Sequence, residues 1–254
     1  PAERDIVRSQ VPDIVVPEVE ANPMSYIQAL DKEGYFSISS SLSKEDVNRV
    51  KYYIDNVKRD NQKLKFSDYG DYLKSLEMEA EIFSVSEKNI ERVTQLVNKT
   101  DQFNLTTKRY TRNEIEAFLG RGDDSISLCA RLGDKYGDNG LVSIIFGSIK
   151  NNILHVELWV MSCRVINRQL EFALFDHLAD ILKSRNIKEL RGYYFKTQKN
   201  ELVSEHYQKL GFKLLERNDK NTVWKFDLFD KKAKLNENSV DRVAFITFHA
   251  CPLA

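Results

Sequence analysis

The residues best suited to chemistry lie where a predicted strand, residues 153 to 160, leads into a predicted helix, residues 168 to 184. The turn between them begins with Ser162–Arg164 and is polar. A helix start offers unpaired N–H groups and the positive end of the helix dipole, and both favour an anion such as phosphate. Arg164 and Arg168 either add charge-assisted hydrogen bonds to that phosphate or are surface arginines. The pattern predicts a phosphate-binding turn, but one without the glycines that let a pyrophosphate approach the backbone.

Cys163 is a candidate nucleophile within this turn. A neighbouring cation, here Arg164, and a helix N-terminus both lower the pKa of a thiol. The resulting thiolate can form an acyl thioester. The alternative is that Cys163 is a small buried hydrophobe, which is a common role for cysteine.

Glu157 and His155 are candidate general bases on the strand before the turn. Residues two apart in a strand share one face of the sheet, so both side chains could reach one substrate. The alternative for each is a cross-strand pair with a neighbouring strand. Trp159, on the same strand, is expected in the core.

The elements that must position these residues alternate between strand and helix patterns from residue 78 onward. Their order is β-α-α-β-β-β-α-β-α-β-β, with strands at 78–85, 125–132, 141–149, 153–160, 189–195, 212–216 and 222–228, and helices at 89–98, 111–119, 168–184 and 200–210. This order predicts an α+β fold with a mixed, mainly antiparallel sheet flanked by helices.

The residues before this region predict a strand at 14–19 and then a helix from Asn22 and Pro23 to Gly34. A longer helix is expected at 43–63. Its apolar stripe, Val47, Val50, Ile54 and Val57, would face inward, and its charged residues would form the outer face of a solvated linker helix.

The composition excludes several classes of protein. Lys plus Arg and Asp plus Glu balance at 38 each, so net charge indicates neither nucleic acid nor an anionic membrane as a partner. No apolar run reaches the roughly 18 residues that would span a bilayer, and no secretory signal is visible. The three cysteines are too few and too scattered for a disulfide framework or a zinc site, so we expect a reduced, cytoplasmic protein. The chain starts at Pro1, so we expect a fragment.

Two motifs resemble the acyl-CoA N-acyltransferase (GNAT) superfamily. That family has Arg or Gln, two residues, Gly, one residue, and Gly or Ala after its fourth strand. Arg164 matches the first position, while Asn167 and Gln169 replace the two small residues. Side chains at these two positions would crowd the backbone approach of a pyrophosphate.

The second motif is Asn, six residues, Tyr, three residues and Gly-Phe, which Asn200, Tyr207, Gly211 and Phe212 match in full. The resemblance implies that Tyr207 lies near the thiol end of CoA and protonates the leaving thiolate. Asn200 is expected either to contact the cofactor or to cap its helix. The alternative for Tyr207 is a core tyrosine on an amphipathic helix.

Three long segments are similar to the C-terminal half of FkbH-like proteins, which join a haloacid-dehalogenase-like (HAD) domain of subfamily IIIC to a GNAT-like domain. These segments are residues 89–111, 159–165 and 193–200. Residues 1–19 resemble the end of that HAD domain. The resemblance implies that the HAD nucleophile lies before Pro1, and that relatives load a glyceryl unit onto an acyl carrier protein or act in cell-surface biosynthesis.

We therefore expect a HAD-derived tail with linker helices at 1–66, a GNAT-like domain at 67–228 and a tail at 229–254. The expected function is acyl transfer or acyl-carrier handling in a two-domain biosynthetic protein. The expected ligand is the pantetheine arm of CoA or of an acyl carrier protein, with no metal, and the upstream HAD domain is an expected partner. The expected binding residues are Val160, Met161, Ser162, Arg164, Asn167, Arg168, Gln169 and Asn200, and the expected catalytic residues are Tyr207, Cys163 and Glu157.

Two alternative functions remain open. One is a non-catalytic module that docks a carrier protein or the HAD domain, which the missing glycines favour. The other is free-standing N-acetylation of an amine, for which nothing in the sequence selects a substrate.

Overall fold

The computed structural model describes residues 4, 6, 7, 10, 16, 17, 19, 22–27, 29, 49–230 and 246–250 of the chain. The chain divides into two compact units, residues 1–51 and 52–254. No helix in this described part is both long enough and apolar enough to cross a bilayer.

In the first unit, a short 3-10 helix η1 covers Pro23–Ser25. The side chain of Asn22 accepts a hydrogen bond of 3.1 Å from the backbone N–H of Met24, as its predicted capping role requires. Val16, Pro17 and Val19 are not in a strand, so the predicted strand at 14–19 is wrong at these three positions, and its other residues lie outside the described ones. Residues 28 and 30–34 of the helix predicted up to Gly34 also lie outside the described residues.

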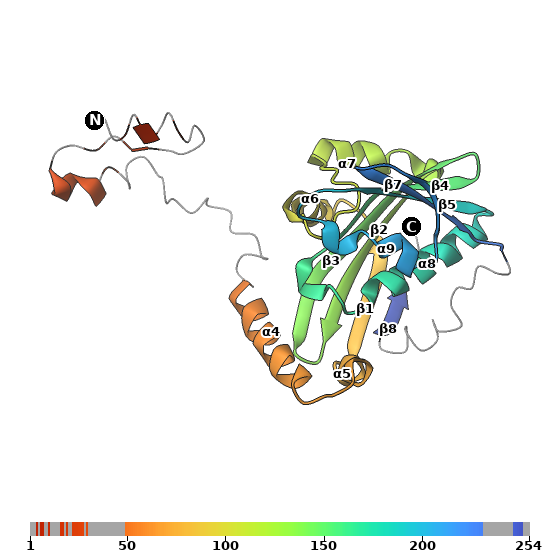
Figure 1. Cartoon of the computed structure of the whole chain (residues 1–254), viewed down its shortest axis with the longest axis horizontal. Coiled ribbons are helices and arrows are strands. Elements are labelled where there is room, and N and C mark those ends of the chain that lie inside the picture. Colours follow the sequence, from red (N-terminus) through yellow and green to blue (C-terminus); the bar gives the residue numbers. More distant parts are fainter. Residues whose placement is uncertain are drawn as a thin grey trace. The chain divides into compact units, whose positions relative to one another are not determined.

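The second unit is built on one mixed sheet (Figure 1). Its eight described strands are β1 (Met78–Ser84), β2 (Ser125–Asp134), β3 (Gly137–Lys150), β4 (Ile153–Met161), β5 (Glu189–Phe195), β6 (Lys213–Arg217), β7 (Asn221–Asp227) and β8 (Ile246–Ala250). They lie in the order β6-β7-β5-β4-β3-β2-β1-β8, and only the β4–β5 and β1–β8 pairs are parallel. The expected mixed, mainly antiparallel sheet flanked by helices is therefore confirmed. Strand β8 adds to this sheet a segment that the sequence analysis assigned to a tail.

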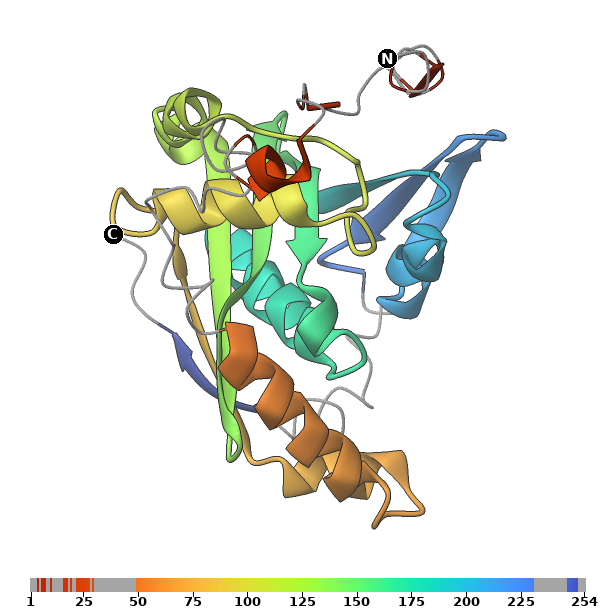
Figure 2. The same ribbon diagram turned by 90° about the vertical axis from the view of Figure 1, so that its left-hand side faces the viewer.

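Helices cover both faces of the sheet, and Figure 2 shows α6 and α8 crossing opposite faces. The described helices of this part are α4 (Arg49–Lys63), α5 (Tyr69–Ser75), α6 (Ile90–Lys99), α7 (Arg112–Leu119), α8 (Leu170–Ser184) and α9 (His206–Lys209), with 3-10 turns η2 (Gly122–Asp124), η3 (Cys163–Val165) and η4 (Glu201–Val203). One core lies between the sheet and α5, α8 and α9, and a second lies under α6 and α7. Thr111 caps α7 through a capping box with Glu114, at the start of the helix predicted for 111–119.

Strand β4 contains an irregularity that shapes the functional region. Its register with β3 shifts between the pairs Phe146–Leu158 and Gly147–Val156, so that Glu157 is the extra residue on β4. Val156 packs in the same core as Trp159, three residues later, because the bulge exchanges the two faces. The bulge explains why the apolar and polar residues of this strand alternate imperfectly in the sequence.

The predicted orientation of α4 is wrong. Asp55 and Arg59, expected on a solvated face, are only 3% and 2% exposed. The predicted apolar stripe points outward instead: Val50, Ile54 and Val57 are exposed, and Val47 lies outside the described residues.

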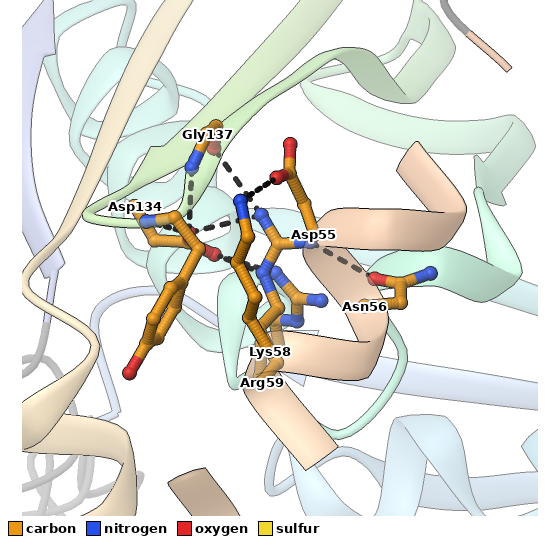
Figure 3. A network of polar contacts seen from close by, with 8 residues as sticks. Asp55, Asn56, Lys58, Arg59, Asp134 and Gly137 are labelled. Carbon is orange, nitrogen blue, oxygen red and sulfur yellow. Dashed lines mark hydrogen bonds and ion pairs between the residues drawn. The ribbon is translucent and has the colours of Figure 1, made fainter. Parts of the chain in front are cut away.

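The reversal has an electrostatic cause, shown in Figure 3. Arg59 donates from Nε and Nη2 to the two carboxylate oxygens of Asp134, over 2.7 and 2.9 Å, at the hairpin between β2 and β3. Arg168 binds the same carboxylate at 3.0 Å. The side chains of Arg59, Asp134 and Arg168 are 3%, 0% and 9% exposed. Two buried arginines therefore share one buried carboxylate, and α4 is held to the sheet by its charged face.

We expect Asp134→Ala to lower the free energy of unfolding by about 3–5 kcal/mol, because it leaves two buried guanidinium groups without their carboxylate. Urea denaturation of the whole chain measures this change. The control is Arg131→Ala, which removes an exposed ion pair with Asp138 on the same hairpin and should change stability by less than about 1 kcal/mol. Equal losses in the two variants would contradict a special role for Asp134.

Candidate functional site

The candidate site lies where β4 and β5 separate. The two strands pair only at Ile153–His155 and Glu189–Arg191, after which the β4 bulge begins. Beyond this point β4 has lost its parallel neighbour, and the backbone of Trp159 and Met161 faces the gap. Such an unpaired strand edge can bind an extended chain through backbone hydrogen bonds.

A segment of the chain itself fills this gap. Residues 103–106, here called the inserted segment, lie in the connection between α6 and α7. The N–H of Leu105 donates to the carbonyl of Trp159 at 3.2 Å, and the N–H of Met161 donates to the carbonyl of Phe103 at 3.0 Å. The hydroxyl of Thr106 donates to the carbonyl of Glu157 at 2.8 Å. The edge at Val160 and Met161, where the pantetheine arm is expected to bind, is therefore occupied by the chain itself.

The far side of the inserted segment contacts β5 and the loop that follows it. The N–H of Phe195 donates to the carbonyl of Leu105 at 2.8 Å. Asn200 is completely buried and donates through Nδ2 to the carbonyls of Asn104 and Phe195, both at 2.9 Å. Its Oδ1 accepts from the N–H of Thr197 at 2.8 Å. Asn200 holds the inserted segment in place, and its side chain makes no cap bond to η4.

A buried polar cluster lies beside the inserted segment and consists of Trp159, His206 and Tyr207. The ring centroid of His206 is 4.5 Å from that of Trp159, 5.5 Å from that of Tyr207 and 5.0 Å from that of Phe103 in the inserted segment. All three residues of the cluster are at most 5% exposed. The atoms Trp159 Nε1, His206 Nε2 and Tyr207 Oη have no hydrogen-bond partner among the described residues.

Burial sets the protonation of this cluster. It lowers the pKa of His206 to about 3, with a smaller contribution from the charge of Lys209, so the imidazole is neutral. Burial also raises the pKa of Tyr207, so its hydroxyl keeps its proton. The backbone of Tyr193 is near this hydroxyl, but the contact lacks the geometry of a hydrogen bond. A protonated, unpaired tyrosine hydroxyl has the chemical form that a general acid requires.

Tyr207 is positioned by Gly192 on β5. A Cβ atom at Gly192 would lie 2.3–2.6 Å from three carbon atoms of the Tyr207 ring, which is closer than side chains can approach. The ring therefore packs directly on the strand backbone, and only glycine permits this contact.

The turn after β4 differs from a simple helix start. Cys163 is exposed on η3, and α8 begins at Leu170 rather than at Arg168. Asn167 and Gln169 have φ values of 68° and 65°, in the left-handed region that glycine adopts most easily. These are the two positions where the GNAT motif has small residues. The backbone conformation that suits glycine is thus present at both positions, although the side chains are larger.

The two arginines of this turn have different surroundings. The guanidinium of Arg164 lies 4.2 Å from the ring centroid of Tyr52 and donates to the carbonyl of Asn139 at 3.2 Å. Arg168 is buried in the ion pair with Asp134, where burial lowers its pKa. Arg168 is therefore structural in this arrangement, while Arg164 lies next to exposed Cys163. Ser162 is buried, and its N–H donates to the carbonyl of Val142 at 2.7 Å.

Glu157 is held by cations rather than placed to accept a proton. Lys108 and Arg121 contact its two oxygens at 3.2 and 3.1 Å. Burial alone would raise the pKa of Glu157, but hydrogen bonds from Ser148 and Lys108, together with the two cations, outweigh burial and lower it. His155 Nδ1 lies 2.7 Å from the hydroxyl of Tyr193 on β5, which is the cross-strand pair named as its alternative.

Sequence reasoning missed three features of the site, namely His206, Gly192 and the inserted segment. His206 had a weak signal, since it is a polar residue at an inward position of a helix otherwise filled with apolar side chains. The role of Gly192 depends on a contact with Tyr207, 15 positions later in the sequence, and the inserted segment was predicted only as a connection between helices.

No family model matches the chain, and no curated protein matches it. Solved structures do match. PaiA N-acetyltransferase from Thermoplasma acidophilum in complex with coenzyme A is 17% identical, with a TM-score of 0.48, over 59% of this chain and 99% of that one. The ribosomal-protein-S18-alanine N-acetyltransferase from Escherichia coli is 12% identical, with a TM-score of 0.46, over 59% and 94%. Spermidine N-acetyltransferase from Vibrio cholerae in complex with CoA and spermine is 9% identical, with a TM-score of 0.46, over 59% and 96%.

We expect Gly192→Ala to lower the free energy of unfolding by about 1–3 kcal/mol, because the new methyl group must displace the Tyr207 ring from the core. The matched control is Gly133→Ala on β2, where a Cβ would meet nothing within 4 Å and stability should stay constant or rise by about 0.4–1 kcal/mol. Chemical denaturation compares the two, and equal effects would show that Gly192 does not position Tyr207.

Proposed function

We propose that this domain binds the pantetheine arm of CoA or of an acyl carrier protein along β4 and acts in acyl transfer. The observation that carries the proposal is the divergence of β4 and β5 after three residue pairs. It leaves the carbonyl of Trp159 and the N–H of Met161 directed at a strand-like partner. A pantetheine arm is extended and carries two amide groups, so it can pair with the same backbone atoms.

The turn after β4 supports an anion at the end of this path. Asn167 and Gln169 retain the left-handed backbone that the GNAT motif normally gives to small residues. Arg164 places a guanidinium at this turn, and a guanidinium suits phosphate by its charge and its N–H groups. We assign the phosphate contact to Arg164 alone, because Arg168 is buried against Asp134.

The proposed reaction uses Tyr207 as general acid. The acceptor attacks the thioester carbonyl, the carbon–sulfur bond breaks, and the thiolate takes the Tyr207 proton while the acceptor loses its own proton to solvent. The high pKa of Tyr207 keeps the required proton on the hydroxyl before the step. Cys163 is exposed and can accept an acyl group from a thioester by exchange, which makes it a second candidate acceptor within the chain.

The FkbH-like resemblance supports a more specific setting. In that setting the chain is the C-terminal part of a two-domain biosynthetic protein, and an upstream HAD domain supplies the unit that this domain passes on or holds. An acyl carrier protein is then the natural partner, because CoA and carrier proteins share the pantetheine arm.

A second candidate function is a non-catalytic docking module for a carrier protein or for the HAD domain. Two observations favour it. The β4 edge is already paired with the inserted segment. In addition, Tyr53, Ile54 and Val57 expose an apolar stripe on α4, with side chains 62%, 53% and 58% exposed. A stripe of this kind suits a partner surface.

We expect millimolar acetyl-CoA to raise the melting temperature of the chain, and Arg164→Ala to abolish that rise by removing the phosphate contact. Arg131→Ala, outside the proposed path, should keep the rise. Differential scanning calorimetry measures both. The acyl-CoA proposal fails if millimolar acetyl-CoA leaves the melting temperature of the unmodified chain unchanged.

The docking module is tested with a holo acyl carrier protein. It predicts binding that Cys163→Ala leaves intact, whereas Tyr53→Asp on the apolar stripe should weaken binding about tenfold or more, because a charge would enter a desolvated interface. Mass spectrometry after mixing with an acylated carrier protein checks for an acyl thioester on Cys163. Detecting that adduct would contradict a purely docking role.

A further inference from the structure

The inserted segment pairs with β4 in the way an extended ligand would. Three backbone atoms of β4 that face the gap are engaged by it: the carbonyls of Glu157 and Trp159 and the N–H of Met161. Asn104 forms an antiparallel bridge with Val160 between these contacts. The inserted segment and a pantetheine arm therefore compete for the same hydrogen-bonding groups.

With the inserted segment paired to β4, here called the closed state, several buried polar atoms have no hydrogen-bond partner. Among the described residues, Asn104 Oδ1 in the inserted segment has no hydrogen-bond partner, and neither do Trp159 Nε1, His206 Nε2 and Tyr207 Oη beside it. A buried polar atom without a partner is unfavourable and rare in folded proteins. These four atoms are hydrogen-bonding groups that a polar ligand in this region can satisfy.

The connections of the inserted segment also favour release. Before the segment, Asp101 makes ion pairs with Arg109 and with Lys199 on the loop after β5, the second at 3.0 Å. These pairs are exposed and therefore weak. After the segment, Thr107 has a φ of 57°, a strained conformation for a β-branched residue. Strained backbone of this kind is found in segments that change conformation. The inserted segment itself is buried, with Phe103 and Leu105 in the core, so its release must also expose these two side chains.

We propose that residues 103–106 are an autoinhibitory strand that must leave β4 before a pantetheine arm binds, and that Trp159, His206 and Tyr207 then become contacts of the ligand. This inference rests on the function proposed above and adds His206 and Trp159 to the site. Departure of Phe103 uncovers one side of the His206 ring. The neutral imidazole and the indole N–H then face the carbonyl or amide groups of the arm.

The test removes one hydrogen bond between the inserted segment and β4. Thr106→Val removes the hydroxyl that binds the carbonyl of Glu157 at 2.8 Å. Thr94→Val is the matched control, because its hydroxyl binds the carbonyl of Ile90 on α6, also at 2.8 Å. Acetyl-CoA affinity is measured by titration calorimetry, and amide hydrogen exchange by NMR, on the whole chain.

We expect Thr106→Val to bind acetyl-CoA about fivefold more tightly than the unmodified chain, since loss of one hydrogen bond shifts the closed population by about that factor. Thr94→Val should bind like the unmodified chain. Acetyl-CoA should accelerate exchange of the N–H groups of Leu105 and Phe195, which lose their partners when the inserted segment leaves.

Two results would overturn the inference in distinguishable ways. If acetyl-CoA binds but exchange at Leu105 and Phe195 is unchanged, the arm binds without moving the inserted segment; the inference is wrong and the proposed function stands. In the second result, no variant binds acetyl-CoA, although the amide of Leu105 exchanges faster in Thr106→Val. The proposed function then fails, and the inserted segment does not control binding of a pantetheine arm.

Discussion

The structure depends on one extra residue in the middle of β4. With Glu157 inserted, the two faces of the strand exchange, and β4 and β5 keep only three of the pairs that strands of their length could form. Everything of chemical interest lies beyond that point. Lys108 and Arg121 hold the bulged side chain in its ionised form, so the irregularity is stabilised by charge on one face of the sheet while it opens a gap at the strand edge.

A gap inside a sheet creates two unpaired strand edges, which tend to attract other chains. The inserted segment covers both edges. Its Phe103 and Leu105 bond to the backbone of β4, and the carbonyl of Leu105 also accepts from Phe195 of β5. This arrangement has one favourable and one unfavourable effect. It satisfies the backbone of the strands but leaves side-chain atoms of Trp159, His206 and Tyr207 unpaired behind it. The same segment thus pairs both strand edges and lies beside these buried polar side chains.

The sheet and its helices could be predicted because period-two and helical patterns are local, and the order from residue 78 to 228 was correct throughout. The site residues were harder to predict than the fold. Cys163, Arg164 and Tyr207 stay predictions, drawn from residue type, spacing and the GNAT-like motif. The burial of Arg168 was not predicted, because it depends on Asp134, 34 positions earlier. The orientation of α4 was missed for the same reason, since a stripe of Val and Ile normally faces inward and only the distant Asp134 reverses it. Long-range ion pairs leave no periodic signal in a sequence.

Asp134 also has a consequence for cooperativity. Its carboxylate contacts a side chain from α4 and one from the turn before α8, and it accepts the N–H groups of Tyr136 and Gly137 in its own hairpin. If this hairpin unfolds, α4 and the turn before α8 therefore lose the same charge partner together. From Tyr52 onward, α4 lies in the same compact unit as the sheet, and its ion pair with Asp134 links it to β2. The amides of α4 around Arg59 should therefore lose protection when the hairpin that carries Asp134 opens.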